Sequence, residues 1–447
     1  MKALRFLWQP VILAVCLGLS AGADAAPKTT EFQLANGLKV VVREDHRAPV
    51  VVAEVWYRVG SSYERPGQTG ISHALEHMMF KGTATVPAGE FSRIVSKFGG
   101  SDNAFTTDDY TAYYQIYGAD RLPLALELES DRMANLVLDP KEFASEIQVV
   151  MEERRMRTDD NPQAKAYERF SALANFTSSS RTPTIGWMSD LTNLTNDELK
   201  SWYQTWYAPN NATLVVVGDV DPDAVKALAD HYFGAIPAKA LPPVAKPTEL
   251  AEPGKRELTL SLPAKVPALY MGYNLPSLNT AATPQDAYIL RMMTGVLDEG
   301  RSARLETRVI RGQQVAAAVS SSYDLFARGD SMLVMTAVPN GKHSIEEVRD
   351  AILAEVEHLK TEPISPEEMQ RVYAAIIASN VFVQDSITSQ ASTIGSLESV
   401  GLSWKLIDTL PDQLKAVTPE QIQAAAKKYL VPSRLSVLYL QPTEIKP

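Results

Sequence analysis

The feature that most constrains the fold is a set of landmarks that occurs twice, once towards the end of each half of the chain. The two segments are LTNDELKSWYQTWYAPNNATLVVVGD, residues 194–219, and VTPEQIQAAAKKYLVPSRLSVLYLQP, residues 417–442. Each has a threonine with Glu or Gln three residues later, which is the capping box of a helix start. Each has a proline 14 positions after that threonine, followed by a strand-like apolar run. The equal spacing predicts two related structural units.

A proline-rich segment separates the two units. Residues 237–257, PAKALPPVAKPTELAEPGKRE, have no periodic apolar face, which is typical of an interdomain linker. We therefore expect an N-terminal domain over residues 27–236 and a C-terminal domain over residues 258–447. A chain of 447 residues is long enough for two domains with substantial cores.

Both units mix strands and helices. The sequence predicts strands over residues 37–45 and 50–61, joined by a short turn at residues 47–49. Further strands are expected over residues 103–118 (a pair), 268–276 and 331–339, and helices over residues 119–136, 139–157 and 344–360. Each half is therefore predicted to be α+β, with helices packed on a mostly antiparallel sheet.

Residues 1–25 have the features of a secretory signal peptide. A positively charged start precedes the apolar run at residues 11–22, and ADA at residues 23–25 fits a cleavage site. The run is too short for a comfortable membrane span, so we expect a protein secreted to a bacterial periplasm without a membrane anchor. Cys16 is the only cysteine and lies inside this segment, where LAVC faintly resembles a lipoprotein signal. A lipoprotein is therefore the alternative to a soluble mature chain, which would have no disulfides.

The net charge of the chain argues against two classes of partner. The formal net charge is −10, and no basic cluster follows the first few residues. These features argue against nucleic acid or an anionic membrane as the main partner.

The stretch GISHALEHMMFKGT, residues 70–83, contains a pattern typical of a metal site. His73 and His77 stand four residues apart and share one face of a helix, so both can bind one ion. Glu76 lies one residue off that axis, where it reaches a metal-bound water instead of the metal, as in the H-x-x-E-H inverted zincin signature. The alternative is an ordinary helix with two incidental histidines. The chain has only six histidines, so two at ligand spacing favour zinc.

Catalytic zinc needs three protein ligands and one open position. Glu146 and Glu153, on the helix predicted over residues 139–157, are seven apart and share a face. One of the pair would bind zinc while the other orients a ligand or the water. Glu152 points elsewhere and is expected in a solvated patch with the neighbouring arginines. A charged surface explains the pair less well, because the apolar residues 149–151 indicate that part of this helix is buried.

HALEH, followed by EIQVVMEERRM, resembles the pitrilysin or insulinase family of zinc metallopeptidases, in its smaller subunit type that includes mitochondrial processing peptidase. The resemblance covers nearly the whole mature chain and includes NGLKVVV, GSSYE, FKGT and YAPNNATLVVVGDVD. It implies Zn²⁺ as the cofactor, with Glu153 as the third ligand beside His73 and His77, and Glu146 as a further motif glutamate. It also implies two α+β roll domains per chain, and two such chains that enclose a cavity.

The same resemblance implies that the segment DNAFT binds the substrate. Asn103 and Ala104 match the edge strand that binds the substrate as an added β-strand. An exposed strand edge offers unpaired N–H and C=O groups to an extended peptide. The alternative is an ordinary strand next to the site.

The second half departs from the family pattern. In the family, an Arg and a Tyr from a segment like SSRL…RGLAYSV help to bind the oxyanion. Here the matching stretch is residues 302–319, which places Ala317 at the tyrosine position and Arg308 and Arg311 only near the arginine position. We therefore expect a dimer, in which a homologous subunit without the zinc motif supplies the Arg and Tyr. The competing interpretation is a homodimer that is active without them.

The expected function is a zinc endopeptidase that acts on short or unfolded peptides held as an added β-strand. Zinc lowers the pKa of a bound water and polarises the scissile carbonyl, while Glu76 takes the water proton and delivers it to the leaving amine. The alternative is a non-catalytic structural or peptide-binding subunit of the same fold. A zinc-stabilised structural domain is disfavoured, because structural sites usually have four ligands, often cysteines.

Overall fold

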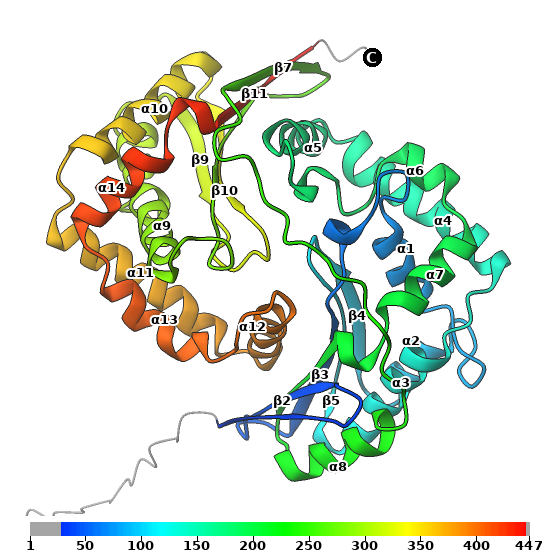
Figure 1. The fold of residues 1–447 in the computed structure, drawn as a ribbon. Helices are drawn as coiled ribbons and strands as arrows, with labels where there is room; N and C mark the ends of the chain where they lie inside the picture. Colours follow the sequence, from blue (N-terminus) through cyan, green and yellow to red (C-terminus); the bar gives the residue numbers. More distant parts are fainter. Residues whose placement is uncertain (1–27, 444–447) are drawn as a thin grey trace, which may run out of the picture.

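Two sheets, one from each half of the chain, organise the fold (Figure 1). The computed structural model describes residues 28–443, without the side chains of residues 381–383. The predicted signal peptide at residues 1–25, with Cys16, lies outside the described residues. Residues 237–255, within the predicted linker, form neither helix nor strand.

The first sheet has the strand order β1-β2-β6-β3-β5-β4 and the second the order β7-β11-β8-β10-β9. The first consists of β1 (Thr29–Gln33), β2 (Lys39–Glu44), β3 (Val50–Tyr57), β4 (Ser101–Thr106), β5 (Thr111–Gly118) and β6 (Ala212–Gly218). The second consists of β7 (Arg256–Leu262), β8 (Ala268–Leu275), β9 (Ala316–Ser322), β10 (Ser331–Pro339) and β11 (Leu435–Pro442). Only β2–β6 and β7–β11 are parallel pairs among these strands. The predicted α+β class with mostly antiparallel sheets is confirmed.

The helices pack on these sheets and on one another (Figure 1). Those of the first half are α1 (Ile71–Met78), α2 (Glu90–Lys97), α3 (Leu122–Asn135), α4 (Pro140–Arg154), α5 (Pro162–Ala174), α6 (Met188–Asn193), α7 (Asn196–Trp206) and α8 (Pro222–Phe233). Those of the second half are α9 (Pro284–Asp298), α10 (Ile345–Thr361), α11 (Pro366–Val383), α12 (Ile387–Ser399), α13 (Leu406–Lys415) and α14 (Pro419–Tyr429). None of the helices in residues 28–443 has both the length and the apolar character needed to cross a bilayer.

The repeated landmarks of the sequence occupy equivalent places in the two sheets. Thr195 begins α7 and Thr418 begins α14, and both bonds of the capping box form in each case. The strands that follow, β6 and β11, take the same position between a parallel and an antiparallel neighbour. The series β2-β6-β3-β5-β4 thus has the same connectivity as β7-β11-β8-β10-β9.

The turn at residues 47–49 does not make a hairpin. β2 and β3 are both strands, but β6 lies between them and pairs with each. The central residues of all three strands are buried, so each strand needs a partner along both edges as well as cover on both faces. Local spacing predicted the strands, but the partner comes from more than 150 residues further along the chain.

Each sheet is covered on one face by a helix of the other half. α12 packs on β3 and β6, where Ala391 and Ile394 belong to the same buried cluster as Trp56, while α5 packs on β11, β7 and β8. Figure 1 shows α12 beside the first sheet and α5 beside the second. A Cβ on Gly395 would lie 2.1 Å from the Trp56 ring, so α12 approaches the sheet as closely as glycine alone allows. The sequence did not predict this exchange.

Arg328, in the loop between β9 and β10, joins the second half to the first. Its guanidinium donates to Asp109 Oδ1 at 3.0 Å and to Ser62 Oγ at 2.8 Å, and lies 4.2 Å from the centre of the Tyr63 ring. Only 6% of Arg328 is exposed. Ser62 and Tyr63 belong to η1 (Ser61–Tyr63), the 3₁₀ turn that precedes α1. The second half therefore contacts the segment that leads into the HALEH helix.

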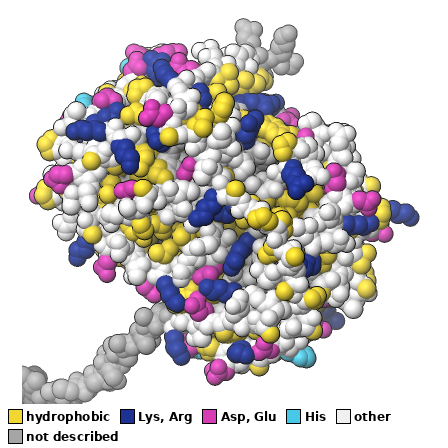
Figure 2. All heavy atoms as spheres, viewed as in Figure 1, with side chains coloured by type: hydrophobic (Ala, Val, Ile, Leu, Met, Phe, Trp, Pro, Cys, Tyr) yellow, Lys and Arg dark blue, Asp and Glu magenta, His cyan; other side chains and the backbone are white. Residues whose placement is uncertain are grey.

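Charged side chains on the surface are mixed in sign. Figure 2 shows Lys and Arg scattered among acidic and apolar side chains on the face in view.

We expect Arg328→Met to lower the free energy of unfolding by about 3–5 kcal/mol, because it leaves the half-buried carboxylate of Asp109 without its cation. Urea unfolding followed by tryptophan fluorescence measures the change. Arg93→Met is the matched control, since Arg93 pairs with Glu90 on an exposed helix surface and its loss should not shift the transition. Equal transitions for the two variants would show that Arg328 does not hold the halves together.

Candidate metal centre

The HALEH segment forms the short helix α1, and two features fix where it begins. Glu64 accepts hydrogen bonds from the backbone N–H groups of Gly70 at 2.7 Å and Ser72 at 2.9 Å. This carboxylate satisfies donors that the first turn of a helix leaves unpaired, and it faces the positive end of the helix dipole. The apolar side of α1, with Leu75 and Met78, is buried in the core of the first half.

Gly70 and Gly186 allow the start of α1 to touch a distant turn. Their φ angles are +86° and +83°, in the left-handed region that favours glycine. A Cβ on Gly70 would lie 2.7 Å from the carbonyl oxygen of Ile185, and one on Gly186 would lie 2.5 Å from that of Thr69. Both positions thus require glycine for the two segments to approach one another.

α4 supplies the carboxylates opposite α1. Asp139 caps this helix by accepting from the N–H of Lys141 at 2.7 Å. Part of this helix is buried, as the apolar residues 149–151 indicated: Val150 and Met151 are buried, although Val149 is 49% exposed. Val149 lies four residues before Glu153 and therefore on the face that carries it.

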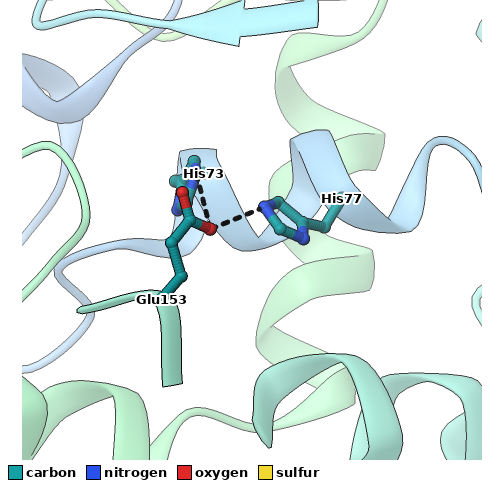
Figure 3. Close-up of side chains that lie close together, drawn as sticks. All are labelled: His73, His77 and Glu153. Carbon is teal, nitrogen blue, oxygen red and sulfur yellow. Dashed lines mark ion pairs between the residues drawn. The ribbon is translucent and has the colours of Figure 1, made fainter. Parts of the chain in front are cut away.

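Three of the predicted residues come together at one point (Figure 3). Glu153 Oε2 lies 3.8 Å from His73 Nε2 and 3.3 Å from His77 Nε2. In Figure 3 one oxygen of Glu153 reaches towards both imidazole rings, which come from α1. All three potential ligand atoms lie within 4.8 Å of one another.

The geometry and chemistry of this cluster fit zinc. In a tetrahedral site with bonds of about 2.1 Å, neighbouring ligand atoms lie about 3.4 Å apart. The two measured separations to Glu153 bracket that value. Two imidazole nitrogens and one carboxylate oxygen also form the His₂Glu ligand set of catalytic zinc, which keeps a fourth position open for water.

Glu146 lies behind His77, away from the three ligand atoms. Its Oε1 is 2.9 Å from His77 Nδ1, and its Oε2 is 2.5 Å from Lys81 Nζ. The hydrogen bond from His77, helped by Lys81, lowers the pKa of Glu146 despite its partial burial. A carboxylate on the second nitrogen fixes the tautomer and orientation of a metal-ligating histidine. Glu146 is therefore placed to orient His77, while Glu153 is placed to bind the metal.

Two further carboxylates of α4, those of Glu152 and Glu153, pair with arginines. Arg157 contacts Glu153 Oε1 at 2.5 Å, so Oε2 is the oxygen that faces the histidines. Glu152 lies on the exposed side and pairs with Arg155 at 2.8 Å, in agreement with the expected solvated patch.

The two histidines have different electrostatic surroundings. Burial, with smaller effects from His77 and Arg157, lowers the pKa of His73 to about 3, so its imidazole is neutral as metal binding requires. Its Nδ1 has no hydrogen-bond partner within residues 28–443. For His77, burial disfavours the charged form, but the hydrogen bond to Glu146 and the nearby carboxylates outweigh it and raise the pKa.

Glu76 stands beside the ligand cluster without belonging to it. Burial raises its pKa, while a hydrogen bond from Thr106 and the nearby His77 act in the opposite direction. Thr106 Oγ1 donates to Glu76 Oε2 at 2.5 Å. A carboxylate of raised pKa next to an open metal position has the properties of a general base.

Asn103 and Ala104 lie on β4, which is the edge strand of the first sheet. β4 pairs with β5 alone, so its other edge carries unpaired backbone groups. α1 packs next to β4, and Asn103 Oδ1 accepts only from the neighbouring N–H of Ala104, at 2.8 Å. The predicted substrate strand is therefore an edge strand beside the cluster.

The second half gives each of its candidate residues a local role. Arg308 pairs with Glu355 at 3.0 Å and with Glu362 at 2.8 Å. Arg311 pairs with Glu306, and Ala317 is exposed on the edge strand β9.

Sequence reasoning did not identify Thr106, Lys81, Arg157 or Glu64 as part of this site. Thr106 and Glu64 stand in DNAFT and GSSYE, segments that gave a signal only through resemblance. Their contacts depend on how α1 packs against β4 and η1, which one sequence does not define.

Two family models match successive parts of the chain. The model described as insulinase, peptidase family M16, matches residues 39–183, which contain the whole cluster. The model described as the peptidase M16 inactive domain matches residues 193–376.

Named relatives match over most of their length. The zinc protease PqqE of Helicobacter pylori is 32% identical over 402 residues, which cover 88% of this chain and 86% of that protein. The uncharacterized zinc protease YmxG of Bacillus subtilis is 26% identical over 395 residues, which cover 88% of this chain and 93% of that protein.

Solved structures share the fold. A protease from Helicobacter pylori superposes with a TM-score of 0.86 at 28% identity, covering 93% of this chain and all of that one. The periplasmic protease PqqL of Escherichia coli superposes with a TM-score of 0.79 at 20% identity. That match covers 94% of this chain but 49% of that chain.

We expect Glu146→Gln to weaken zinc binding roughly 10- to 100-fold, because the amide no longer anchors His77 Nδ1 as a charged acceptor. Competition with a chromophoric chelator measures the affinity. Glu152→Gln changes a carboxylate of the same helix that faces solvent and should bind zinc as the wild type does. If the two variants bind zinc equally, Glu146 does not orient the ligand.

Proposed function

The chain belongs to the insulinase family of peptidases, peptidase family M16, and from this premise we propose that it is a zinc-dependent endopeptidase. Its substrates would be short or unfolded peptides held as an added strand on β4. The observation that carries the proposal is the position of Glu76, which stands beside three atoms with the geometry of a catalytic zinc site. The names of the relatives, which are zinc proteases, support zinc as the cofactor.

His73, His77 and Glu153 would hold the metal, which when bound polarises the scissile carbonyl and makes the attacking water more acidic. Glu76 accepts a proton from that water as the water oxygen bonds to the carbonyl carbon. As the C–N bond breaks, Glu76 returns the proton to the leaving amine, so its own charge is restored. The open edge of β4, beside Asn103 and Ala104, would align the peptide with these groups.

The same chain would be one subunit of a dimer, and a heterodimer is the form that we propose. Ala317 stands at the expected tyrosine position, and Arg308 and Arg311 are engaged in ion pairs. Among the residues that the structure describes, the second half therefore offers no obvious donor for the oxyanion. The Escherichia coli relative supports pairing, because one chain of that protease has room for two units of this size. A homologous subunit would supply the Arg and Tyr.

Location outside the cytoplasm is part of the proposal. The features of residues 1–25 support secretion to a bacterial periplasm, and the Escherichia coli relative is described as a periplasmic protease. The proposal includes no membrane anchor after cleavage of this segment.

One observation favours the alternative of a non-catalytic structural or peptide-binding subunit. Residues 193–376 match a domain described as inactive. That match leaves out residues 73–153, where the predicted base and ligands lie. A scaffold has no need of a buried carboxylate beside a metal site, so catalysis remains the better-supported function.

We expect Glu76→Gln to retain zinc and to lose roughly 10²- to 10⁴-fold in kcat, because the amide cannot accept the water proton. Cleavage of an internally quenched peptide, with and without a chelator, measures activity, and metal analysis measures zinc. Glu152→Gln provides the control and should cleave like the wild type. Full activity in Glu76→Gln would remove Glu76 from its assigned role.

The heterodimer is tested by expressing the chain alone and together with a homologous chain that lacks the zinc motif but carries the Arg and Tyr. We expect zinc-loaded but weakly active protein alone, and roughly 10²- to 10³-fold more activity in the pair, as for the gain of an oxyanion donor. Changing the partner's tyrosine to phenylalanine is the matched control and should remove most of the gain. A fully active homodimer would overturn this part of the proposal.

A further inference from the structure

The last residue of the edge strand β4 makes a contact that the reaction above does not use. Thr106 ends β4, and its hydroxyl lies on the carboxylate of Glu76. On the premise of the proposed peptidase function, we propose that Thr106 is a positioning residue that couples the addition of a peptide to β4 to the orientation of Glu76.

The hydroxyl proton of Thr106 has one good acceptor. Glu76 Oε2 is 2.5 Å away, whereas Thr111 Oγ1 is 3.4 Å away. Thr111 is fully buried and donates its own proton to the carbonyl of Val59 at 2.9 Å. The Thr106 proton therefore goes to Glu76, in the distance range of a charge-assisted O–H···O⁻ bond.

The hydrogen bond from Thr106 gives the two carboxylate oxygens of Glu76 different roles. Oε2 is held by Thr106, while Oε1 accepts no side-chain hydrogen bond from the described residues. A carboxylate fixed at one oxygen presents the other in a defined direction, which a general base needs because catalysis falls steeply with small displacements. Thr106 thus determines which oxygen of Glu76 is left for the water.

The position of Thr106 in the strand connects it to the substrate. Ala104 and Thr106 are two residues apart and share a face of β4, the face on which Ala104 packs into the core beneath α1. Thr106 pairs in register with Thr111 of β5, so only the opposite edge of β4 is open to a peptide. A peptide strand on that edge orders the backbone of β4, and with it the Cα of Thr106.

The side chain of Thr106 then connects the ordered backbone of β4 to Glu76. Threonine is β-branched and has a stiff χ1, so a fixed Cα fixes the hydroxyl. Thr106 also lines a cavity of about 740 Å³ between the two halves, together with Tyr110 and Tyr323. Thr106 therefore stands where the end of the edge strand meets this cavity.

The test compares Thr106→Val with Thr106→Ser in the zinc-loaded protein. Each variant is assayed in the same assembly, homodimer or heterodimer, in which the wild type is active. Valine keeps the shape and removes the donor, whereas serine keeps the donor. We expect Thr106→Val to lower kcat on a quenched peptide roughly 10- to 100-fold, with KM and the zinc affinity within about twofold of wild type. Thr106→Ser should recover most of that loss.

Two further variants separate positioning from packing. Thr111→Val removes the neighbouring hydroxyl, which does not touch Glu76, and should leave kcat unchanged even though it costs stability. In a Glu76→Gln background, Thr106→Val should cause little further loss, because the residue acts through the base that is already gone.

Three results would overturn the proposal. They are an unchanged kcat in Thr106→Val, a loss that appears in KM or zinc affinity instead of kcat, and a loss that adds in full to that of Glu76→Gln. Each of these is measured against a wild type with chelator-sensitive cleavage. Absence of such cleavage in the wild type, alone and with its partner subunit, overturns the proposed function and this inference with it.

Discussion

The distance that a tetrahedral metal imposes between its ligands is the constraint on which this structure depends. Two histidines four residues apart satisfy it within one helix, but the third donor comes from a helix 76 residues further along the chain. The packing of α1 against α4 must therefore bring that donor to the histidines. Arg154 shows how: next to Glu153, it donates to Glu168 of α5 at 2.8 Å and to the carbonyl of Gly186 at 2.7 Å. Gly186 abuts Gly70 at the start of α1, so one buried guanidinium relates both ligand helices.

The second half contributes to this arrangement without carrying a ligand. α4 continues through the turn η3 (Arg155–Asp159) into α5, and α5 is buried against the second sheet. Arg328 reaches from the other half to Ser62, in the turn η1 just before Glu64 and α1. Both ligand helices are thus anchored, through α5 and through η1, on the half that has no metal-binding residues in the cluster. The exchange of α5 and α12 makes the two halves one mechanical unit around the site.

The sequence predicted what depends on local spacing and missed what depends on packing. The helix with His73 and His77, the α+β class and the repeated helix starts follow from periodicity and capping, which act within a few residues. Spacing also placed Glu146 and Glu153 on one face, but it left open which of them lies next to the histidines. That depends on the position at which α4 packs along α1. The insertion of β6 between β2 and β3 and the exposure of Val149 depend on elements distant in the chain. A prediction from periodicity alone contains no such information.

The open edge of β4 gives a reason for Glu76, the proposed general base, to be held by a strand as well as by a helix. An open edge is needed to pair with a peptide, yet an edge without a partner strand is the least ordered part of a sheet. A base on α1 alone would stay in place whether or not a peptide were present. By holding Glu76 from the end of β4, the fold would make the orientation of the proposed base depend on the backbone that we propose as the substrate strand. The disorder that an empty edge permits would then extend to the carboxylate, and peptide pairing would remove both at once.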